Sequence, residues 1–331
     1  MPLAWVFDFH NVTTTSSSTS TEIAVRVDRV THRYGSRVAL SDVSLDVRAS
    51  EIFGFLGPNG SGKTTLFRLL STLIPPAEGR VTIFNRDVVS QRDDVRRGIG
   101  VVFQSPSLDK HLTASENLRH HGHLYGLRGA ELESRITEML AALNLSDRAS
   151  ERVGKFSGGM RRRVELAKGM LTRPGVLLLD EPSTGLDPAA RIDLWDILHR
   201  ARLQQGVTIL LTTHLMDEAD RCDRLAILES GRLLACDTPA AMKSQIGGDV
   251  ISLITSDTGA ASQTLRDRLG VDAKVVDGVL RVELPRAHEF VPRIIEALPP
   301  GAVQSISVGQ PTLEDVFVRL TGHRFRERSV E

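Results

Sequence analysis

The order of apolar and polar residues predicts strands and helices that alternate over most of the chain. From Ile23 onward, Val25, Val27 and Val30 stand among polar residues, a spacing typical of antiparallel strands with one buried face. Later runs are apolar at nearly every position, which is typical of strands buried on both faces of a parallel sheet: Ile52–Leu56, Val176–Leu179 and Val207–Thr212. We therefore expect an α/β fold with a mostly parallel central sheet and an antiparallel β subdomain.

A helical period is present between these strands. Apolar residues recur every three or four positions between residues 111 and 145, and Pro188–Arg202 also has the spacing of a helix. The first of these patterns predicts an inserted helical subdomain at about residues 106–171. It belongs to a core domain that we expect to span residues 23–245.

After about Gly247 the pattern changes to a shorter series of elements in the order β, α, β, β, α, β, closed by a helix at Thr312–Thr321. We expect a small α+β accessory domain at residues 246–331. It has no cluster of acids, histidines or glycines, so a regulatory role and a dimer-stabilising role are both open. Residues 1–22 contain a polar Ser/Thr run and predict a disordered tail.

Composition excludes several classes of protein. Lys+Arg and Asp+Glu both number 41, so there is no basic excess to indicate a nucleic-acid partner. The two cysteines, Cys222 and Cys236, have neither metal-ligand nor disulfide-framework spacing, which favours a reduced, cytosolic setting. No stretch approaches the roughly 18–20 apolar residues needed to cross a bilayer, and the first residues lack the basic region of a signal peptide.

A glycine-rich segment follows the first apolar run and precedes a predicted helix that Pro75 and Pro76 end. It matches the pattern G-x-x-x-x-G-K-[ST] and consists of Gly57, Pro58, Asn59, Gly60, Ser61, Gly62, Lys63, Thr64 and Thr65. Glycines let backbone N–H groups converge on phosphate oxygens, and the helix N-terminus adds positive charge there. Lys63 is placed to reach the β- and γ-phosphates and Thr64 to ligate Mg²⁺. The segment predicts binding of a nucleoside triphosphate.

Two carboxylates end the apolar run at Val176–Leu179. Asp180 is suited to the Mg²⁺ shell, and Glu181 is suited to orient and deprotonate an attacking water. A plain strand-end cap is the alternative, but a phosphate loop upstream favours the catalytic interpretation. A base for water also favours hydrolysis over phosphoryl transfer to a small molecule.

Ser157, Gly158 and Gly159 open a helix predicted at Arg161–Leu171. Ser157 is a good N-cap, and the glycines leave the first N–H groups of the helix bare. Alone, this would more often be an ordinary helix start. Because the segment lies a short distance upstream of the acidic strand, we expect it to meet the γ-phosphate of a nucleotide held by another subunit.

Together these segments resemble the ATP-binding-cassette (ABC) family over all but the first twenty-odd residues. Gly57–Thr64 is similar to its Walker A loop, Val176–Glu181 to its Walker B strand with the catalytic glutamate, and Phe156–Met160 to its Leu-Ser-Gly-Gly-Gln signature. Other residues match its Q-loop glutamine, its switch histidine and its adenine-stacking ring: Gln104, His214 and Tyr34. Phe156 and Met160 depart from the signature but leave the phosphate-binding positions intact. The form Phe156–Arg163 and the tail Pro311–Gly322 resemble the drug-resistance and ABC-2-type exporter branch.

The resemblance implies that two copies sandwich two ATP molecules and power a separate ABC-2-type permease from the cytoplasmic face of the membrane. Thr64, Gln104 and Asp180 would serve Mg²⁺, Glu181 would activate water, and His214 would contact the γ-phosphate. The transported substrate would be a drug, a lipid or another hydrophobic or amphipathic molecule. An importer ATPase stays open as an alternative. An ABC ATPase that acts on ribosomes or DNA is a further one, although the chain lacks the second cassette or long coiled coil usual there.

Overall fold

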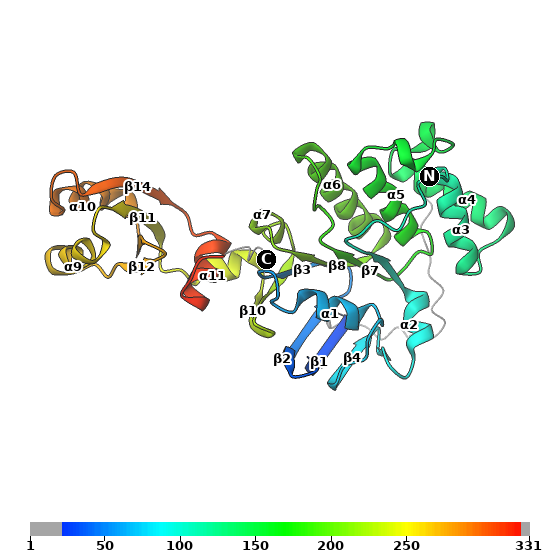
Figure 1. Cartoon of the computed structure of the whole chain (residues 1–331), viewed down its shortest axis with the longest axis horizontal. Coiled ribbons are helices and arrows are strands. Elements are labelled where there is room, and N and C mark those ends of the chain that lie inside the picture. Colours follow the sequence, from blue (N-terminus) through cyan, green and yellow to red (C-terminus); the bar gives the residue numbers. More distant parts are fainter. Residues whose placement is uncertain (1–21, 326–331) are drawn as a thin grey trace, which may run out of the picture. The chain divides into compact units, whose positions relative to one another are not determined.

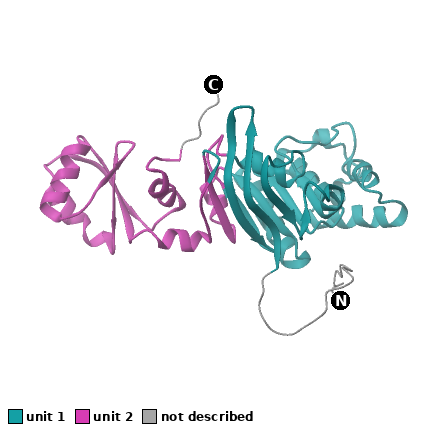
Figure 2. Cartoon of the chain, turned by 90° about the horizontal axis from the view of Figure 1, so that it is seen from below, with its two compact units in different colours: residues 1–55, 62–213, 230–232 teal, residues 56–61, 214–229, 233–331 magenta. Residues whose placement is uncertain are grey.

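The structure, a computed structural model, describes residues 22–325. The predicted disordered tail therefore lies outside the described residues, apart from Glu22. The described chain divides into two compact units, which Figure 2 distinguishes by colour. Unit 1 contains residues 22–55, 62–213 and 230–232, and unit 2 contains residues 56–61, 214–229 and 233–325.

An antiparallel sheet in unit 1 has the strand order β2-β1-β4-β5 (Figure 1). Its strands are β1 (Ile23–Tyr34), β2 (Arg37–Arg48), β4 (Glu78–Ile83) and β5 (Arg86–Asp87). Val27 and Val30 are three positions apart yet both buried, which strict alternation would not allow. The β1–β2 register shifts between them, where Arg29 has a φ of 48°. This irregularity returns Val30 to the buried face.

The apolar runs of unit 1 form neighbouring strands in the order β3-β8-β7-β6. These are β3 (Ile52–Leu56), β8 (Thr208–Thr213), β7 (Val176–Asp180) and β6 (Ile99–Val102). β7 pairs in parallel with both β6 and β8, so the carboxyl ends of these three strands meet at one edge. Asp180 ends β7 at that edge.

The predicted helical region consists of α3 (Ala114–Leu124), α4 (Gly129–Ala142) and α5 (Gly158–Met170). The continuous signal at residues 111–145 is thus two helices, because Gly126 adopts a φ of 83° between them. A capping box of Thr113 and Glu116 starts α3.

Further helices of unit 1 are α1 (Lys63–Leu70), α2 (Arg92–Gly98) and α6 (Pro188–Gln205). The sequence predicts that Pro75 and Pro76 end α1, but the structure shows that they do not. The helix stops earlier, at Leu70, and Thr72 follows with a φ of 61°. A left-handed residue at this point turns the chain away from the helix before the prolines are reached.

The C-terminal part of unit 2 has the predicted βαββαβ order. Its antiparallel sheet, β12-β13-β11-β14, is built from β11 (Asp249–Thr255), β12 (Lys274–Val276), β13 (Val279–Leu284) and β14 (Val303–Gly309). The helices are α9 (Thr258–Leu269) and α10 (Val291–Ala297), and their apolar faces share one core with the sheet, including Leu253, Leu265, Leu280 and Ile294. A 3-10 turn, Ala287–Glu289, precedes α10.

A second core cluster of unit 2 joins residues far apart in the sequence. α11 (Leu313–Thr321) contributes Val316 and Phe317, β9 (Arg224–Glu229) contributes Ile227, and α8 (Pro239–Ser244) contributes Met242. Leu56, the residue before the glycine-rich segment, belongs to the same cluster. The remaining α-helix and β-strand of the described residues are α7 (Met216–Ala219) and β10 (Arg232–Asp237). The cluster is complete only when α11, the last helix of the described residues, packs against it.

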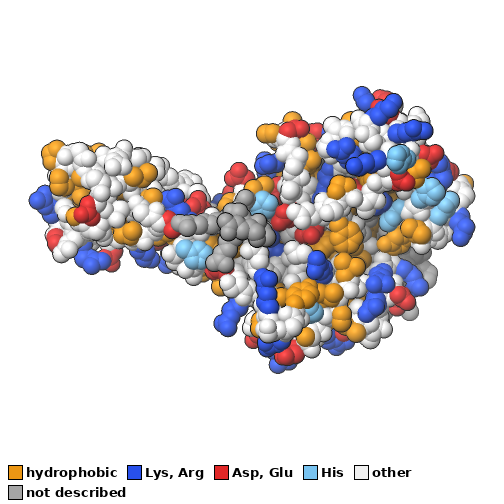
Figure 3. Space-filling model, viewed as in Figure 1, with side chains coloured by type: hydrophobic (Ala, Val, Ile, Leu, Met, Phe, Trp, Pro, Cys, Tyr) orange, Lys and Arg blue, Asp and Glu red, His pale blue; other side chains and the backbone are white. Residues whose placement is uncertain are grey.

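The predicted fold class is confirmed: an α/β core with an antiparallel sheet and a helical region, followed by a small α+β part. On the face drawn in Figure 3, positive and negative side chains are interspersed. In the part of the chain that the structure describes, every helix is too short or too polar to span a bilayer.

Candidate active site

The glycine-rich segment adopts backbone conformations that demand glycine. Gly60 and Gly62 have φ values of 81° and 105°. A Cβ on Gly62 would lie 2.8 Å from the carbonyl oxygen of Ala39, and a Cβ on Gly57 would lie 2.3 Å from that of Leu228. The glycines of the sequence pattern are therefore a steric necessity, apart from any role in the predicted phosphate binding.

The residues of this segment fit a bound polyphosphate. Gly62 caps α1 and has no side chain that could accept from the N–H groups of the first turn. Ser61 is buried, and its Oγ has no hydrogen-bond partner within residues 22–325. Lys63 is buried too, and burial lowers its pKa, an effect that the charges of Glu181 and Asp180 partly reverse. Phosphate oxygens would accept from all three kinds of donor.

Asp180 is a buried carboxylate held by a neighbouring strand. Burial raises its pKa, whereas a hydrogen bond from the Thr212 side chain acts in the opposite direction. Thr212 Oγ1 donates to Asp180 Oδ1 at 2.6 Å and accepts from the backbone N–H of Glu181 at 2.9 Å. Thr212 is fully buried and lies in β8, so one hydroxyl fixes both acidic residues.

Glu181 has a φ of 42°, which is unusual for a residue other than glycine. Such a conformation costs about 1–3 kcal/mol and persists only where the surroundings hold it. Its Oε2 accepts from Gln104 Nε2 at 3.1 Å and from Thr184 Oγ1 at 3.2 Å. The structure thus brings together Gln104, Glu181 and Asp180, and the charges of both acids act on Lys63.

The protein side chains at this site are too few to bind a metal ion alone, so a bound substrate would have to supply further ligand atoms. Among the described residues, no group of three or more His, Cys, Asp or Glu side chains could hold a metal ion. Mg²⁺ is commonly bound by one or two carboxylates together with substrate phosphates. Asp180 and the exposed hydroxyl-bearing Thr64 at the start of α1 fit this donor set.

Ser157 is the N-cap of α5, and its Oγ accepts from the N–H of Met160 at 3.2 Å. Ser157 and Gly158 are exposed, whereas Phe156 before them is buried. The Phe at this position therefore anchors the start of the helix. The helix N-terminus itself stays accessible to another molecule.

Two further predicted residues, Tyr34 and His214, stand at or directly after the ends of strands. Tyr34 ends β1, is 43% exposed and packs edge-on against His32. His214 directly follows β8 and belongs to unit 2, whereas Glu181 belongs to unit 1. Their roles stay predictions.

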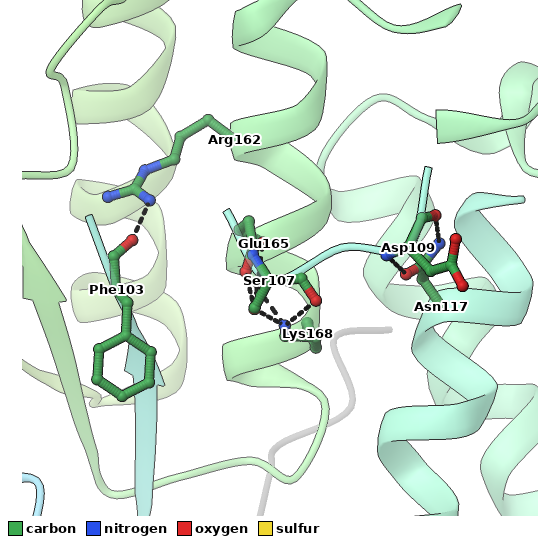
Figure 4. A network of polar contacts seen from close by, with 7 residues as sticks. All are labelled: Phe103, Ser107, Asp109, Asn117, Arg162, Glu165 and Lys168. Atoms are coloured by element: carbon green, nitrogen blue, oxygen red, sulfur yellow. Dashed lines mark hydrogen bonds and ion pairs between the residues drawn. The ribbon is translucent and has the colours of Figure 1, made fainter. Parts of the chain in front are cut away.

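A network on α5 holds the segment that contains Gln104 (Figure 4). Arg162 donates to the carbonyl oxygen of Phe103, and Glu165 and Lys168 contact Ser107. Sequence reasoning missed these residues and Thr212. The available signals were the helical spacing of Arg162, Glu165 and Lys168, and a threonine at the carboxyl end of an apolar strand.

Fold and site define a P-loop ATPase, in which a strand leads into a phosphate-binding loop and an acidic strand lies beside it. A sequence profile described as "ABC transporter" matches residues 40–184. The daunorubicin resistance ATP-binding protein DrrA2 of Streptomyces coeruleorubidus is 40% identical over 91% of the chain and 96% of its own length. The Nod factor export ATP-binding protein I of Sinorhizobium fredii is 38% identical over 96% of the chain and 91% of its own length. The chain belongs to the ABC transporter ATPase family.

Solved structures agree. An ATP-binding subunit of an ABC transporter matches with a TM-score of 0.61 and 32% identity, over 68% of this chain and 93% of that one. The dimeric ATP-binding cassette MJ0796, bound to ADP and Pi after hydrolysis, matches with a TM-score of 0.58 and 29% identity, over 65% and 98%. The chain is thus an ATP hydrolase of a membrane transporter, and its predicted resemblance to drug-resistance and export ATPases is confirmed.

Proposed function

We propose that the chain works as a dimer that powers export of a drug, a lipid or another amphipathic molecule through a separate ABC-2-type permease at the cytoplasmic face of the membrane. The direction of transport is supported by the relatives, whose names concern drug resistance and Nod factor export and whose identity extends over at least nine-tenths of the chain. The catalytic part is supported above all by one contact, the hydrogen bond between Gln104 and Glu181 beside the buried Asp180.

In the proposed reaction, the backbone of residues 57–65 and Lys63 bind the phosphates of ATP. Thr64, Gln104 and Asp180 are the residues that would hold Mg²⁺, directly or through water, and the ion would neutralise charge on the phosphates. Glu181 orients the attacking water and accepts its proton. Gln104 Nε2 holds Oε2 of this carboxylate, so the other oxygen is the one directed to water.

The partner copy completes the site. The exposed N-terminus of α5, with Ser157, Gly158 and Gly159, suits the γ-phosphate of ATP held by the second copy because its N–H groups carry partial positive charge. By the family resemblance, His214 contacts the γ-phosphate and Tyr34 stacks on adenine. Closure of the dimer around ATP and its opening after hydrolysis would drive the permease.

We further propose that residues 23–245 form the ATPase domain and that residues 246–331 act as an accessory domain, either regulatory or dimer-stabilising. The separate core of Leu253, Leu265, Leu280 and Ile294 supports this division. Deletion of the accessory domain is a poor test, because it would also remove Val316 and Phe317 from the cluster that contains Leu56. Point changes on its surface are better suited.

The catalytic proposal is tested with Glu181→Gln. This variant should lose ATP hydrolysis yet form an ATP-dependent dimer, measured by light scattering after size exclusion. Glu78→Gln, at an exposed strand position, is the matched control and should behave as the wild type. Turnover near the wild-type rate in Glu181→Gln would show that the base lies elsewhere.

The export proposal is tested in inverted membrane vesicles that contain the chain and the membrane protein that co-purifies with it. Such vesicles should accumulate a fluorescent anthracycline when ATP is added outside, and vesicles with Glu181→Gln should not. ATP-dependent loss of a preloaded substrate, with no accumulation, would indicate an importer instead.

A further inference from the structure

The buried arginine Arg162 does more than fill the interior of unit 1. Arg162 is 9% exposed, and burial lowers the pKa of its guanidinium to about 10. The guanidinium therefore stays charged at neutral pH. A buried guanidinium is costly unless its N–H groups find acceptors. The acceptors that Arg162 uses are main-chain carbonyl oxygens.

These carbonyl groups flank the two residues that meet in the active site. Arg162 Nε donates to Pro182 O at 2.7 Å and Nη2 to Asp180 O at 3.4 Å, on either side of Glu181. Arg162 Nη1 donates to Phe103 O at 2.9 Å, directly before Gln104 (Figure 4). A single planar fork therefore joins the backbone of both segments.

Glu181 needs such support, since its backbone is in the left-handed region with a φ of 42°. Thr212 accepts from its N–H, and Arg162 donates to the carbonyl oxygens of the residues before and after it, Asp180 and Pro182. Glu165 and Lys168 lie three and six positions further along α5 and hold Ser107, on the far side of Gln104. Side chains of α5 thus hold Phe103 and Ser107, the residues that flank Gln104. They also hold the residues directly before and after Glu181.

We propose that Arg162 is a positioning residue for ATP hydrolysis, which holds Glu181 and Gln104 in the geometry where their side chains meet. Lysine cannot replace it fully, because the donors of an ammonium share one nitrogen, whereas the guanidinium of Arg162 reaches its three carbonyl oxygens from three separate nitrogens. Arg162 is in the helix that Ser157 starts, so contact between Ser157 and a partner's nucleotide would bear on the same fork. The inference rests on the proposed role of Glu181 as the base.

The test compares Arg162→Gln and Arg162→Lys with the matched changes at Arg163, whose side chain instead pairs with Asp193. Loss of a residue that orients a catalytic group typically costs about 10- to 100-fold in activity. We expect Arg162→Gln to lower kcat by about that factor and Arg162→Lys by less. The KM for ATP and the affinity for a trinitrophenyl-ATP probe should change less than about threefold, and both Arg163 variants should keep wild-type kcat.

A role through Glu181 makes a sharper prediction. Addition of Arg162→Gln to Glu181→Gln should cause no further loss of the residual single-turnover rate, because residues that act as a unit are not additive. Equal losses in the two backgrounds would overturn the inference. So would near wild-type kcat in Arg162→Gln, or failure of both Arg162 variants to fold and bind the probe, since Arg162 would then act in folding.

Failure of the base assignment is recognised separately. A fast Glu181→Gln variant would overturn the role of Glu181 and the inference with it. A slow Glu181→Gln variant beside a fast Arg162→Gln variant would overturn the inference alone.

Discussion

We expect the hydroxyl of Thr212 to contribute to both the stability and the activity of the protein. Thr212→Val removes this hydroxyl with little change in the shape of the side chain. In the structure it donates to Asp180 Oδ1 at 2.6 Å and accepts from Glu181 N at 2.9 Å, in a fully buried position. Valine can do neither. The carboxylate loses a donor, and the backbone N–H of Glu181 loses its acceptor.

The magnitude follows from these two losses. A hydrogen bond to a charged group contributes about 1.5–3 kcal/mol, and a buried N–H without an acceptor costs about 1–3 kcal/mol. We expect Thr212→Val to lower the free energy of unfolding of unit 1 by about 3–5 kcal/mol. Because the strained backbone of Glu181 also loses a restraint, kcat should fall by about tenfold or more.

Urea unfolding measures the first effect. Trp195 is buried in α6 and reports on unit 1, and a Trp5→Phe background removes the other tryptophan of the chain. Thr212→Ser keeps the hydroxyl and loses only a methyl group, so it is the matched control. ATP turnover of the same three proteins measures the second effect.

The reasoning is refuted if Thr212→Val unfolds within about 1 kcal/mol of the wild type and keeps its kcat. It is also refuted if Thr212→Ser is as damaged as Thr212→Val, because packing of the methyl group would then be the cause.

Three further predictions concern other parts of the molecule. Gly62→Ala should abolish binding of a fluorescent ATP analogue, since the new Cβ meets Ala39 O at 2.8 Å and φ is 105°; unchanged affinity would contradict this steric argument. Phe317→Ala should lower the free energy of unfolding of unit 2 by about 3–5 kcal/mol, measured by hydrogen exchange, and Phe317→Leu by less. Burial raises the pKa of Asp180 in the folded protein, so folding favours the protonated carboxyl. The resulting contribution to the free energy of unfolding is fully present below pH 3.8 and is lost as the pH rises through the pKa of the folded state. The wild type should therefore lose stability to urea relative to Asp180→Asn as the pH is raised above 3.8, and parallel curves would show that Asp180 is not the cause.

Much of the fold and the site can be read from the sequence, because the signals are local. Gly57–Thr65 is a pattern whose spacing is set by one turn and one helix end, and Asp180 and Glu181 follow a single apolar strand. The βαββαβ order of the C-terminal part is likewise visible in the alternation of periods. Each of these features depends on residues a few positions apart.

The supporting residues depend on distant contacts, so no local pattern reveals them. Thr212 reaches Asp180 across 32 positions, and Arg162 reaches Phe103 across 59. An arginine in a run of three looks like part of a solvated helix face until its carbonyl partners are known. The pattern at residues 111–145 does not mark the break between α3 and α4, because the helical period continues on both sides of Gly126.

The closing helix α11 has a consequence for how this chain can be made and lost. Its residues Val316 and Phe317 follow all the predicted nucleotide-binding motifs in the sequence, yet they pack in the cluster with Leu56, directly before the glycine-rich segment. A premature stop codon shortly before α11 would therefore leave every predicted nucleotide-binding motif in the translated chain. It would still remove Val316 and Phe317 and expose the apolar side chains of that cluster to water. Truncated copies should be removed by proteases rather than persist as subunits that bind ATP without completing a transporter.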